Sequence, residues 1–588
     1  MKRLTCLLLA SLLLLSGCSS SNKTPSETST PEVNAVSGTF KATTTGRKGP
    51  MTVETVLEKG EIKSVTVLEH TESKIYSDKA LETIPQEIVA NQSTNIDAVA
   101  GATFTSNAIK FAVEDCLKQA GADKTNYSAE VKKVTPTDEV VEADIVIMGA
   151  GAAGLMAGIN AAEAGKKVVI AETLGFAGGN LLSAVGVIAG PGSKIQKAHG
   201  IEMTPDSYLD TKIKRRDAAK TYLQYHDETP ERTLRFYQQN QIVCDWITDR
   251  GIKYVEPPMG VSHTLAPGYY QGVSNFTYFL IDTFEKAGGK IYYETTGTSL
   301  IKEGDAVVGF TAVSDEKNYT FKGESTLVVT GGFTSNSEKV KELYPEFSSM
   351  YSTAMISNTG DGLDMIEAVG GTTEAIDAGI HKIPVTTKGK IDIPFFTIMS
   401  GAILVNENGE RFTSEAGNPP AMMELMIKEH NGKGYFILDE DDKNLLTPTT
   451  SSIFNLEAAE VFSNVEEAAK AMNMPGLVEQ VKSYNEGASA EKPVDEQFKR
   501  AFNVSPIEGD KIYVLPIEPG LYLTYGGVKT DDDMRVLDTE GNHIKGLYAA
   551  GDITGSTEVK EGFGYTAGVT HALSFGMIAS ETIMNDTK

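Results

Sequence analysis

The order of apolar and polar positions after residue 36 predicts a hairpin followed by a helix. Polar and apolar side chains alternate over residues 51–56 and again over 62–67, as in strands with one buried face. A turn containing Gly60 separates the two segments, so the strands are expected to pair. Over residues 108–120 the apolar positions return at helical spacing, and Gly121 follows them. This part of the chain is therefore predicted to be a small α+β domain.

A second pattern, beginning at residue 143, predicts a parallel βαβ unit. Residues 143–148 form a nearly continuous apolar run, and an alanine-rich segment and a second apolar run over 167–171 follow it. The glycines after the first run permit a tight turn and close approach of a pyrophosphate, and the acid after the second run can bind a ribose hydroxyl. The residues expected to bind the dinucleotide are Gly149, Gly151, Ala153, Gly154 and Glu172.

The first seventeen residues are predicted to be a secretory signal. Lys2 and Arg3 precede an apolar run that ends at Leu15, which is too short and too one-sided in charge for a membrane span. Residues 15–18 resemble a lipoprotein signal, with Cys18 as the lipidated first residue of the mature chain. The segment 18–36, rich in Ser, Thr, Asn and Pro, is predicted to be a flexible tether. We expect an extracytoplasmic protein, lipid-anchored to the cell membrane at the cell surface or in the periplasm.

Composition narrows the class of partner. With 588 residues, 40% of them hydrophobic, the chain can bury several cores. The 79 acidic and 53 basic residues give a formal net charge of −26, which argues against nucleic acid as a partner. No Cys-x-x-Cys-His sequence occurs, so attached haem c is excluded, and no metal site is expected. Cys116 and Cys244 fall in different predicted domains and are expected to be buried thiols rather than a disulfide.

Residues 97–106 carry a motif that resembles the attachment site of covalent FMN in small extracytoplasmic domains. In those domains the phosphate of FMN forms a phosphoester with the threonine of Gly-Ala-Thr, which is Thr103 here. The small residues Gly101 and Ala102 would let the phosphate approach this hydroxyl. The threonine lies just ahead of the predicted helix, where phosphate is favoured. Taken alone, the motif could be an ordinary loop; with the dinucleotide motif that follows, it indicates two flavins and an electron relay.

From residue 143 to the C-terminus the chain resembles the fumarate-reductase flavoprotein family. The matching segments are 178–180, 329–333, 359–362, 401–406, 409–412, 524–527 and 550–552. The resemblance implies an α/β protein in which a small α+β FMN-binding domain precedes a Rossmann-type FAD domain with an inserted α+β capping domain. It implies non-covalent FAD, with contacts from Gly178, Gly179, Asn180, Gly331, Asp361, Gly551 and Asp552.

These features predict the domain boundaries. The charged and polar composition of 122–142 indicates a linker, and the edges of the capping domain are left open. The predicted units are 1–17 signal peptide, 18–36 tether, 37–121 FMN-binding domain, 122–142 linker, 143–253 first part of the FAD domain, 254–506 a stretch that includes the capping domain and returns to the FAD domain near 320–365, and 507–588 last part of the FAD domain.

Most substrate-binding residues of the resembled family are absent. Reducing a polarised C=C bond requires a hydride from the flavin, a proton donor, and a group that stabilises charge on the activating carbonyl or carboxylate. Where the family has its acid arginine, residues 414–420 read Ser-Glu-Ala-Gly-Asn-Pro-Pro, and the Thr-Glu pair of the family corresponds to Pro394 and Phe395. Burying a dicarboxylate without cationic partners is costly. We therefore expect a substrate other than fumarate, with at most one carboxylate and a flat, apolar or aromatic part facing Phe395, Phe396 and Met399.

Four residues are candidate replacements for the missing groups. His381 falls where the family has a substrate-binding histidine. Tyr522 and Tyr525 could donate a proton from a phenol in a dry site, although a tyrosine beside a Gly-Gly turn could equally be a packing residue. Lys560 could supply the missing cation or be a surface charge. Arg411 is expected to be structural.

Three functions are compatible with the sequence, and we favour the first. It is a reductase of an activated C=C bond, similar to urocanate and fumarate reductases, acting on an enoate or enone with electrons from an external quinone-linked or flavin-based donor. The second is a dehydrogenase resembling the ketosteroid 1-dehydrogenases, which is less favoured because dehydrogenation needs no electron-entry domain. The third is a non-catalytic surface electron-transfer flavoprotein, suggested by the missing arginine.

Overall fold

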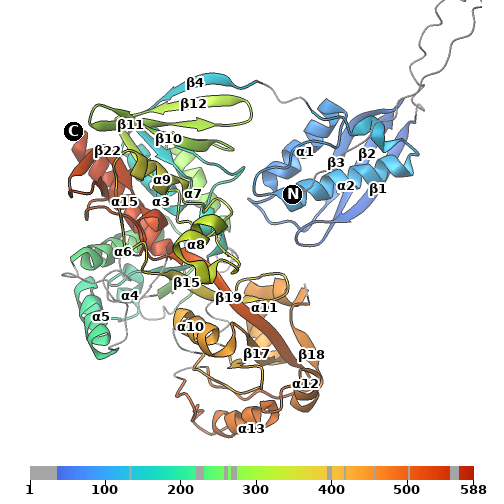
Figure 1. The fold of residues 1–588 in the computed structure, drawn as a ribbon, viewed down its shortest axis with the longest axis vertical. Helices are drawn as coiled ribbons and strands as arrows, with labels where there is room; N and C mark the ends of the chain where they lie inside the picture. The colour runs from blue at the N-terminus through green and yellow to red at the C-terminus, as the bar shows by residue number, and fades with distance from the viewer. Residues whose placement is uncertain are drawn as a thin grey trace, which may run out of the picture.

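The protein folds as a small N-terminal domain, a large α/β domain, and a third domain inserted into the second (Figure 1). The computed structural model describes residues 36–131, 135–184, 186–219, 231–256, 262–265, 274–393, 400–415, 419–455, 457–500, 503–556 and 568–588. The predicted signal and tether, Cys18, Lys560, Phe395, Phe396 and Met399 lie outside these residues. Among the helices in the described ranges, none is both long and apolar enough to cross a membrane.

The N-terminal domain packs two helices against a three-stranded antiparallel sheet. It comprises β1 (Gly38–Thr45), β2 (Pro50–Glu58), β3 (Glu61–Glu69), α1 (Asp78–Asn91), α2 (Thr103–Gln119) and the 3-10 helix η1 (Lys124–Tyr127). Every second residue of β2 from Met51 to Leu57 is buried, and β2 pairs with β3 as the predicted hairpin. Helix α2 begins earlier than its apolar periodicity indicates, so Thr103 is the first residue of the helix and does not precede it.

The predicted linker over 122–142 is too long. Tyr127 of η1 is buried in the N-terminal core, where its hydroxyl donates to the carbonyl of Gly60 over 2.6 Å. At the other end, β4 (Thr137–Glu142) pairs in parallel with β12 (Lys317–Lys322) of the large domain. Strand β4 is the edge strand of its sheet and Val141 is its one buried residue, which explains why its composition is that of a linker.

The large domain is built on a ten-stranded mixed sheet. The remaining strands are β5 (Ile145–Met148), β6 (Val168–Ala171), β9 (Lys290–Tyr292), β10 (Thr296–Glu303), β11 (Ala306–Val313), β13 (Ser325–Val328), β21 (Arg535–Leu537) and β22 (His543–Ala549). Its helices are α3 (Ala152–Glu163), α4 (Lys194–Ala198), α5 (Pro205–Ala219), α6 (Glu231–Asp249), α7 (Ser274–Lys286), α8 (Ser337–Leu343), α9 (Asp361–Ala368) and α15 (Gly568–Asp586). Shorter elements are η2 (Gly179–Ser183), η4 (Pro345–Phe347), η6 (Gly551–Thr554), β7 (Val187–Ala189), β8 (Ser262–Thr264), β14 (Thr373–Glu374) and β20 (Gly527–Val528).

Both faces of this sheet are covered, which explains the continuous apolar runs of its central strands. Along β5, Ile145 and Ile147 enter the core formed with α3, α7 and α15, whereas Val146 and Met148 enter the core on the opposite face, which includes α9. Strands β22, β13, β5, β6 and β9 are adjacent and parallel, so their carboxyl ends lie at one edge. Ligands of open α/β sheets bind at that edge.

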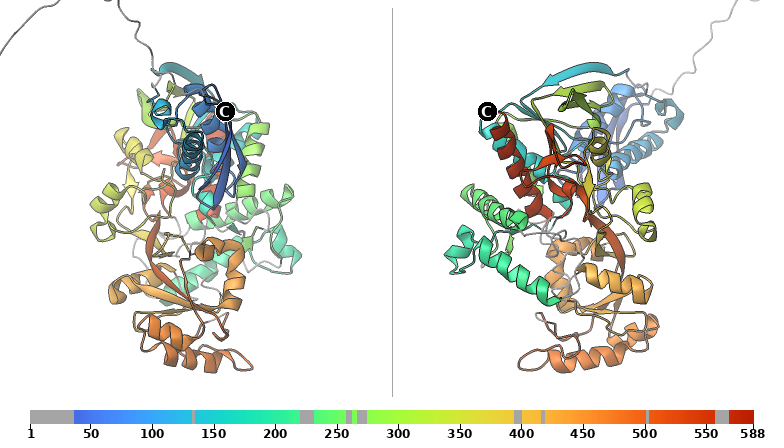
Figure 2. Two further views of the ribbon diagram at one scale, coloured as in Figure 1. Left: turned by 90° about the vertical axis from the view of Figure 1, so that its right-hand side faces the viewer. Right: turned by 60° about the vertical axis from the view of Figure 1, so that its left-hand side comes forward.

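The inserted domain, residues 380–524, lies at the end of the large domain opposite β4 (Figures 1 and 2). Its sheet contains β15 (Ile380–Thr386), β16 (Ile403–Val405), β17 (Gly434–Asp439), β18 (Glu460–Phe462) and β19 (Ile512–Thr524). Its helices are α10 (Pro419–His430), α11 (Glu440–Asn455), α12 (Val465–Ala471) and α13 (Leu477–Ala488). The predicted boundary at 506 falls too early, because β19 pairs with β15, β17 and β18 before the chain returns to the large domain.

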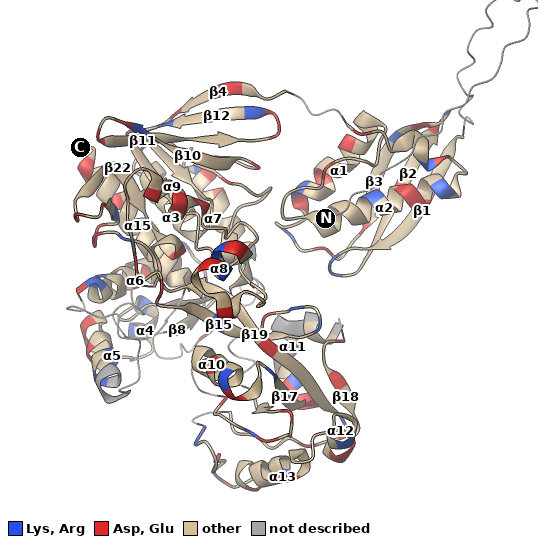
Figure 3. Ribbon diagram, in the orientation of Figure 1, with Lys and Arg blue, Asp and Glu red and all other residues tan. Residues whose placement is uncertain are grey.

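The thiols follow the expectation from the sequence, and residues of both charges occur in every described domain. In the ribbon of Figure 3, acidic and basic residues are interspersed along the elements of all three domains. Cys116 and Cys244 are both buried, and neither is in a disulfide. Burial raises the pKa of the Cys244 thiol to about 12, so this side chain behaves as a packing residue.

Candidate active site

A cavity of about 400 Å³ lies at the carboxyl ends of the parallel strands. It is the place where a doubly wound sheet binds a dinucleotide. Of the predicted FAD contacts, Gly149, Gly151, Ala153, Glu172, Gly179, Asn180, Gly331, Asp361, Gly551 and Asp552 line it. Gly154 and Gly178 do not line the cavity, and their backbone geometry indicates a different role.

In the glycine loop over residues 149–154, neighbouring backbone atoms leave no space for a side chain at two positions. Gly149 has φ +109°, and a Cβ there would lie 2.7 Å from the carbonyl oxygen of Val329. A Cβ on Gly154 would lie 2.1 Å from the carbonyl oxygen of Gly149. Gly154 therefore lets α3 pack against the loop, and it acts on the cavity through this packing.

The start of α3 and the side chain of Glu172 fit the phosphate and ribose of a dinucleotide. Gly151 precedes α3 and offers no side-chain cap, so amides of the first turn are available to an anion at the cavity. Glu172 is buried and accepts hydrogen bonds from the amides of Ala150, over 2.8 Å, and Leu174, over 2.9 Å. Burial nevertheless raises the pKa of Glu172 to about 7. Ribose hydroxyls would supply the further donors that favour its charged form.

Asn180 and Asp552 join two distant segments at the cavity wall. The Asn180 amide donates to the Asp552 carboxylate over 3.2 Å, and its carbonyl accepts from the amide of Met355 over 2.9 Å. Burial raises the pKa of Asp552 to about 6. Asp361 is the exposed first residue of α9 at the same cavity. The structure thus brings together segments that the sequence separates by hundreds of residues.

Three of the four candidate catalytic residues lie together where β15 meets β19. The ring centroid of His381 is 5.8 Å from that of Tyr522 and 6.0 Å from that of Tyr525. Of the three, Tyr522 lines the cavity, whereas His381 packs behind it. Burial and the neighbouring ammonium of Lys382 lower the pKa of His381 to about 3, so its imidazole is neutral. Burial raises the pKa of both tyrosines, which therefore stay protonated at neutral pH.

Asp392 is a residue near this site that the sequence reasoning missed. It is half-buried just after β15, and burial raises its pKa. It lies within electrostatic range of Tyr522 and of Arg47 in the N-terminal domain. The available signal was an acid inside the apolar segment 391–396.

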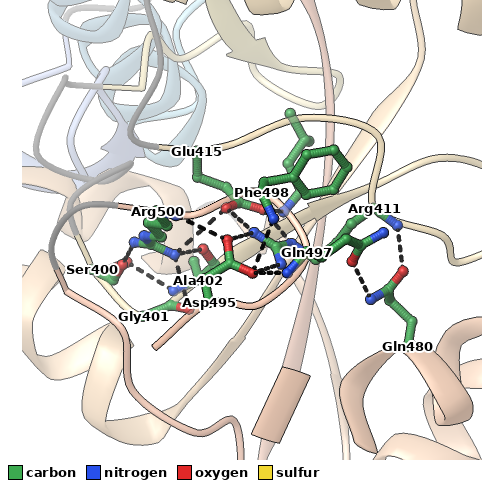
Figure 4. A network of polar contacts seen from close by, with 11 residues as sticks. Ser400, Gly401, Ala402, Arg411, Glu415, Gln480, Asp495, Gln497, Phe498 and Arg500 are labelled. Carbon is green, nitrogen blue, oxygen red and sulfur yellow. Dashed lines mark hydrogen bonds and ion pairs between the residues drawn. The ribbon is translucent and has the colours of Figure 1, made fainter. Parts of the chain in front are cut away.

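Arg411 is held in a buried ion network of the inserted domain (Figure 4). Its guanidinium donates to both oxygens of Glu415, over 2.9 and 2.7 Å, and of Asp495, over 2.9 and 3.0 Å. Arg500 is 3.7 Å from Glu415 and donates to the carbonyl of Ala402 over 2.8 Å. These four charged side chains have almost no exposed surface. The guanidinium of Arg411 is therefore buried and fully paired within the inserted domain, as expected of a structural residue.

Thr103 is exposed in the first turn of α2, as attachment of a phosphate requires. Beside it, the ring of Phe104 is 63% exposed, and the guanidinium carbon of Arg47 lies 5.6 Å from the centroid of that ring. Ala102 provides no side-chain cap to the helix. The hydroxyl, the uncapped helix start and the neighbouring cation fit the phosphate of FMN.

Two protein families match this chain. The FAD-binding domain family matches residues 144–564, and the FMN-binding domain family matches residues 46–118. A urocanate reductase of Eggerthella lenta is 27% identical over 567 residues, covering 92% of this chain and 91% of that protein. An NADH:fumarate oxidoreductase of Klebsiella pneumoniae is 26% identical over 556 residues, covering 92% of this chain and 58% of that protein.

The fold also matches a solved structure. The open conformation of a flavocytochrome c3 fumarate reductase superposes with a TM-score of 0.62 at 24% identity, covering 76% of this chain and 79% of that one. The predicted fold class and the cofactors FAD and FMN are confirmed. The chain therefore belongs to the fumarate and urocanate reductase flavoproteins, oxidoreductases acting on CH–CH groups, with an FMN-binding domain ahead of the FAD-binding domain.

Proposed function

We propose that this protein is an extracytoplasmic, lipid-anchored reductase of the activated C=C bond of an enoate or enone. Electrons from an external quinone-linked or flavin-based donor would enter at FMN on Thr103 and pass through non-covalent FAD to the acceptor. The observation that carries the proposal is a cavity lined both by residues predicted to bind the dinucleotide and by Tyr522.

FAD in this cavity would supply the hydride for the acceptor. The residues of the chain hold and orient it: the loop from Gly149 and the start of α3 face the pyrophosphate, and Glu172 faces the ribose. Asn180 and Asp552, fixed by their mutual hydrogen bond, line the same cavity. Because these contacts come from several segments of the large domain, the position of the flavin is set by the fold.

Tyr522 is our candidate proton donor. Its raised pKa keeps the phenol protonated, and Tyr522 lines the cavity in which the acceptor would bind. Neutral His381 supports its ring from behind, which makes His381 a positioning residue in this proposal. Tyr525 contacts His381 and does not line the cavity, so we assign it to packing. Lys560 lies outside the described residues, so its role as the cation that replaces the missing arginine stays a prediction.

The charges of the cavity favour an acceptor other than fumarate. Among the described residues that line it, the charged ones are Glu172, Asp361 and Asp552, all acidic. None of these lining residues is basic, so the desolvation of a dicarboxylate would not be compensated there. An acceptor with at most one carboxylate and a flat apolar or aromatic part fits better.

The proposal can be tested by reoxidation of the reduced protein. The anaerobically reduced protein is mixed with urocanate, cinnamate, acrylate, fumarate and cyclic enones while the flavin spectrum is followed. We expect rapid reoxidation by at least one enoate or enone and slow reoxidation by fumarate. Reoxidation by quinones or metal ions alone would instead support a surface electron-transfer protein. Reduction of the oxidised flavin by a saturated ketone would support the dehydrogenase.

A further inference from the structure

The N-terminal domain contacts the large domain through a specific set of polar side chains. Tyr278 of α7 accepts a hydrogen bond from the amide of Ile75 over 3.1 Å, and its hydroxyl donates to the carboxylate of Asp78. Lys79 forms an ion pair with Glu294, and the two side chains are 30% and 36% exposed. All three contacts lie at the start of α1, so they fix that end of the N-terminal domain to the large domain.

Apolar side chains from both domains form a small core beside these contacts. Ile75 and Tyr76 pack with Leu174, Phe176 and Leu182 of the large domain. The rings of Tyr76 and Phe176 meet edge to face, with centroids 5.1 Å apart at 62°. Burying aromatic surface in this geometry stabilises the contact beyond the polar bonds.

Gly101, the glycine of the FMN-attachment motif, packs closely against the large domain. Gly101 has φ +82°, and a Cβ there would lie 2.6 Å from the ring of Phe176. A Cβ on Gly175 would lie 2.8 Å from Val99, and the amide of Gly175 donates to the carbonyl of Ala100 over 3.4 Å. Thr103 therefore comes two residues after a backbone segment in contact with the large domain.

The same contact completes the flavin cavity. Ala100 of the N-terminal domain is one of the residues that line it. The hydroxyl of Tyr76 is hydrogen-bonded to Ser183 of the large domain, and Tyr76 lies near Asp392 of the inserted domain. Tyr76, Ser183 and Asp392 are each partly exposed, and none of them is among the residues that line the cavity.

We infer that the docked N-terminal domain is one wall of the flavin cavity, so that docking brings Thr103 to the large domain and closes the cavity in a single event. This inference rests on the proposed function only in taking FAD as the occupant of the cavity. By thermodynamic linkage, any ligand that contacts this wall must also favour docking.

The ion pair of Lys79 and Glu294 allows a charge-exchange test. Glu294→Lys and Lys79→Glu each place like charges at the contact, and the double variant restores opposite charges. Glu163→Lys is a matched control, because Glu163 pairs with Arg250 over 2.8 Å within the large domain at similar exposures of 39% and 29%. Tyr76→Ala removes the ring that packs on Phe176 beside this wall.

Two measurements on the full-length protein report docking and closure separately. Amide hydrogen exchange over residues 174–182 reports docking. Sulfite adds to the isoalloxazine ring and bleaches it, so its rate of addition reports access to FAD; a Thr103→Ala background leaves FAD as the bleached flavin. Neither measurement uses an organic acceptor, so failure of the proposed reductase activity would not be mistaken for failure of this inference.

We expect each single charge reversal to speed both amide exchange and sulfite addition about tenfold, since close like charges shift such an equilibrium by that order. The double variant should return both rates to within about twofold of the wild type, and Glu163→Lys should change neither. Tyr76→Ala should speed sulfite addition.

Faster amide exchange with unchanged sulfite addition would show that the N-terminal domain docks without forming a wall of the cavity. No change in either rate would show that the contact does not form in solution. Each of these two results overturns the inference.

Discussion

The two ends of the flavin cavity are built in different ways. The nucleotide end is made mostly of backbone and glycine, from the loop at 149–154 to Glu172, within one contiguous βαβ unit. At the acceptor end the side chain of Tyr522 lines the cavity, and Asp392 and Tyr76, which come from distant segments and do not line it, lie nearby. A backbone site tolerates few substitutions, whereas a side-chain site can change its chemistry without altering the fold. This difference fits the prediction from the sequence that the chain keeps the flavin-binding residues of the family it resembles and lacks most of its substrate-binding residues.

The largest effect should come from adding a side chain to a tightly packed glycine at the nucleotide end. Gly154→Val places a side chain where even a Cβ would overlap the carbonyl oxygen of Gly149, so the loop must move. We expect FAD affinity to fall by about 10³-fold, measured as FAD retained after gel filtration. Gly165→Ala is the control: Gly165 has φ +87°, but nothing lies within 4 Å of its Cβ position. Equal FAD retention by both variants would contradict a backbone-determined site.

The inserted domain, which carries much of the acceptor end, should depend on its buried ion network. Arg411→Met leaves Glu415 and Asp495 buried without their main partner. We expect a loss of about 3–5 kcal/mol in the free energy of unfolding, measured by denaturant titration. Lys433→Met removes an exposed pair with Glu407 and should leave the free energy of unfolding almost unchanged. A small loss in the Arg411 variant would mean that the network does not hold this domain together.

Glu172 should make the FAD-free protein sensitive to pH. Its folded-state pKa of about 7 lies above its ordinary value of 4.5, so the folded protein retains a proton that the unfolded chain releases between these values. The stability that Glu172 contributes is therefore present below pH 4.5 and is lost as pH rises through about 7. Relative to wild type, Glu172→Gln should gain about 3 kcal/mol in unfolding free energy across this range. A pH-independent difference between the two proteins would refute this assignment.

The smallest predicted effects separate the two tyrosines of the acceptor end. Tyr522→Phe removes a hydroxyl from the cavity wall and should lower kcat by about 10²-fold, as expected for loss of a general acid. Tyr525→Phe, which keeps the ring beside His381, should change kcat by less than about threefold. The readout is steady-state reduction of the best acceptor from the panel. The reverse order of effects would move the proton donor to Tyr525.

Most residues predicted for the nucleotide end line the cavity, and the signals of its βαβ unit are local. The apolar runs, the glycine spacing and Glu172 all lie within thirty residues, and the hairpin of β2 and β3 was equally visible. Strand β4 was missed because an edge strand can be polar. The end of the inserted domain was missed because the single strand β19 extends beyond the predicted boundary at 506.

The acceptor end was harder to predict because it depends on packing between domains. His381, Tyr522 and Tyr525 were found through resemblance, but their different positions relative to the cavity are visible only in the structure. Tyr76 and Asp392 were missed because no local pattern shows that the N-terminal and inserted domains approach the same space. Such contacts depend on the tertiary arrangement and leave little trace in periodicity.

The central claim, that two flavins on one chain feed a single acceptor site, can be tested by counting electrons. Wild-type protein and Thr103→Ala are fully reduced, freed of excess reductant, and mixed anaerobically with an excess of the enoate or enone identified by the panel. Each flavin stores two electrons, and each C=C reduction consumes two electrons and two protons. We predict two molecules of reduced product per wild-type protein and one per Thr103→Ala protein. One molecule from both would show that FMN does not supply the acceptor site, and none from either would contradict the account as a whole.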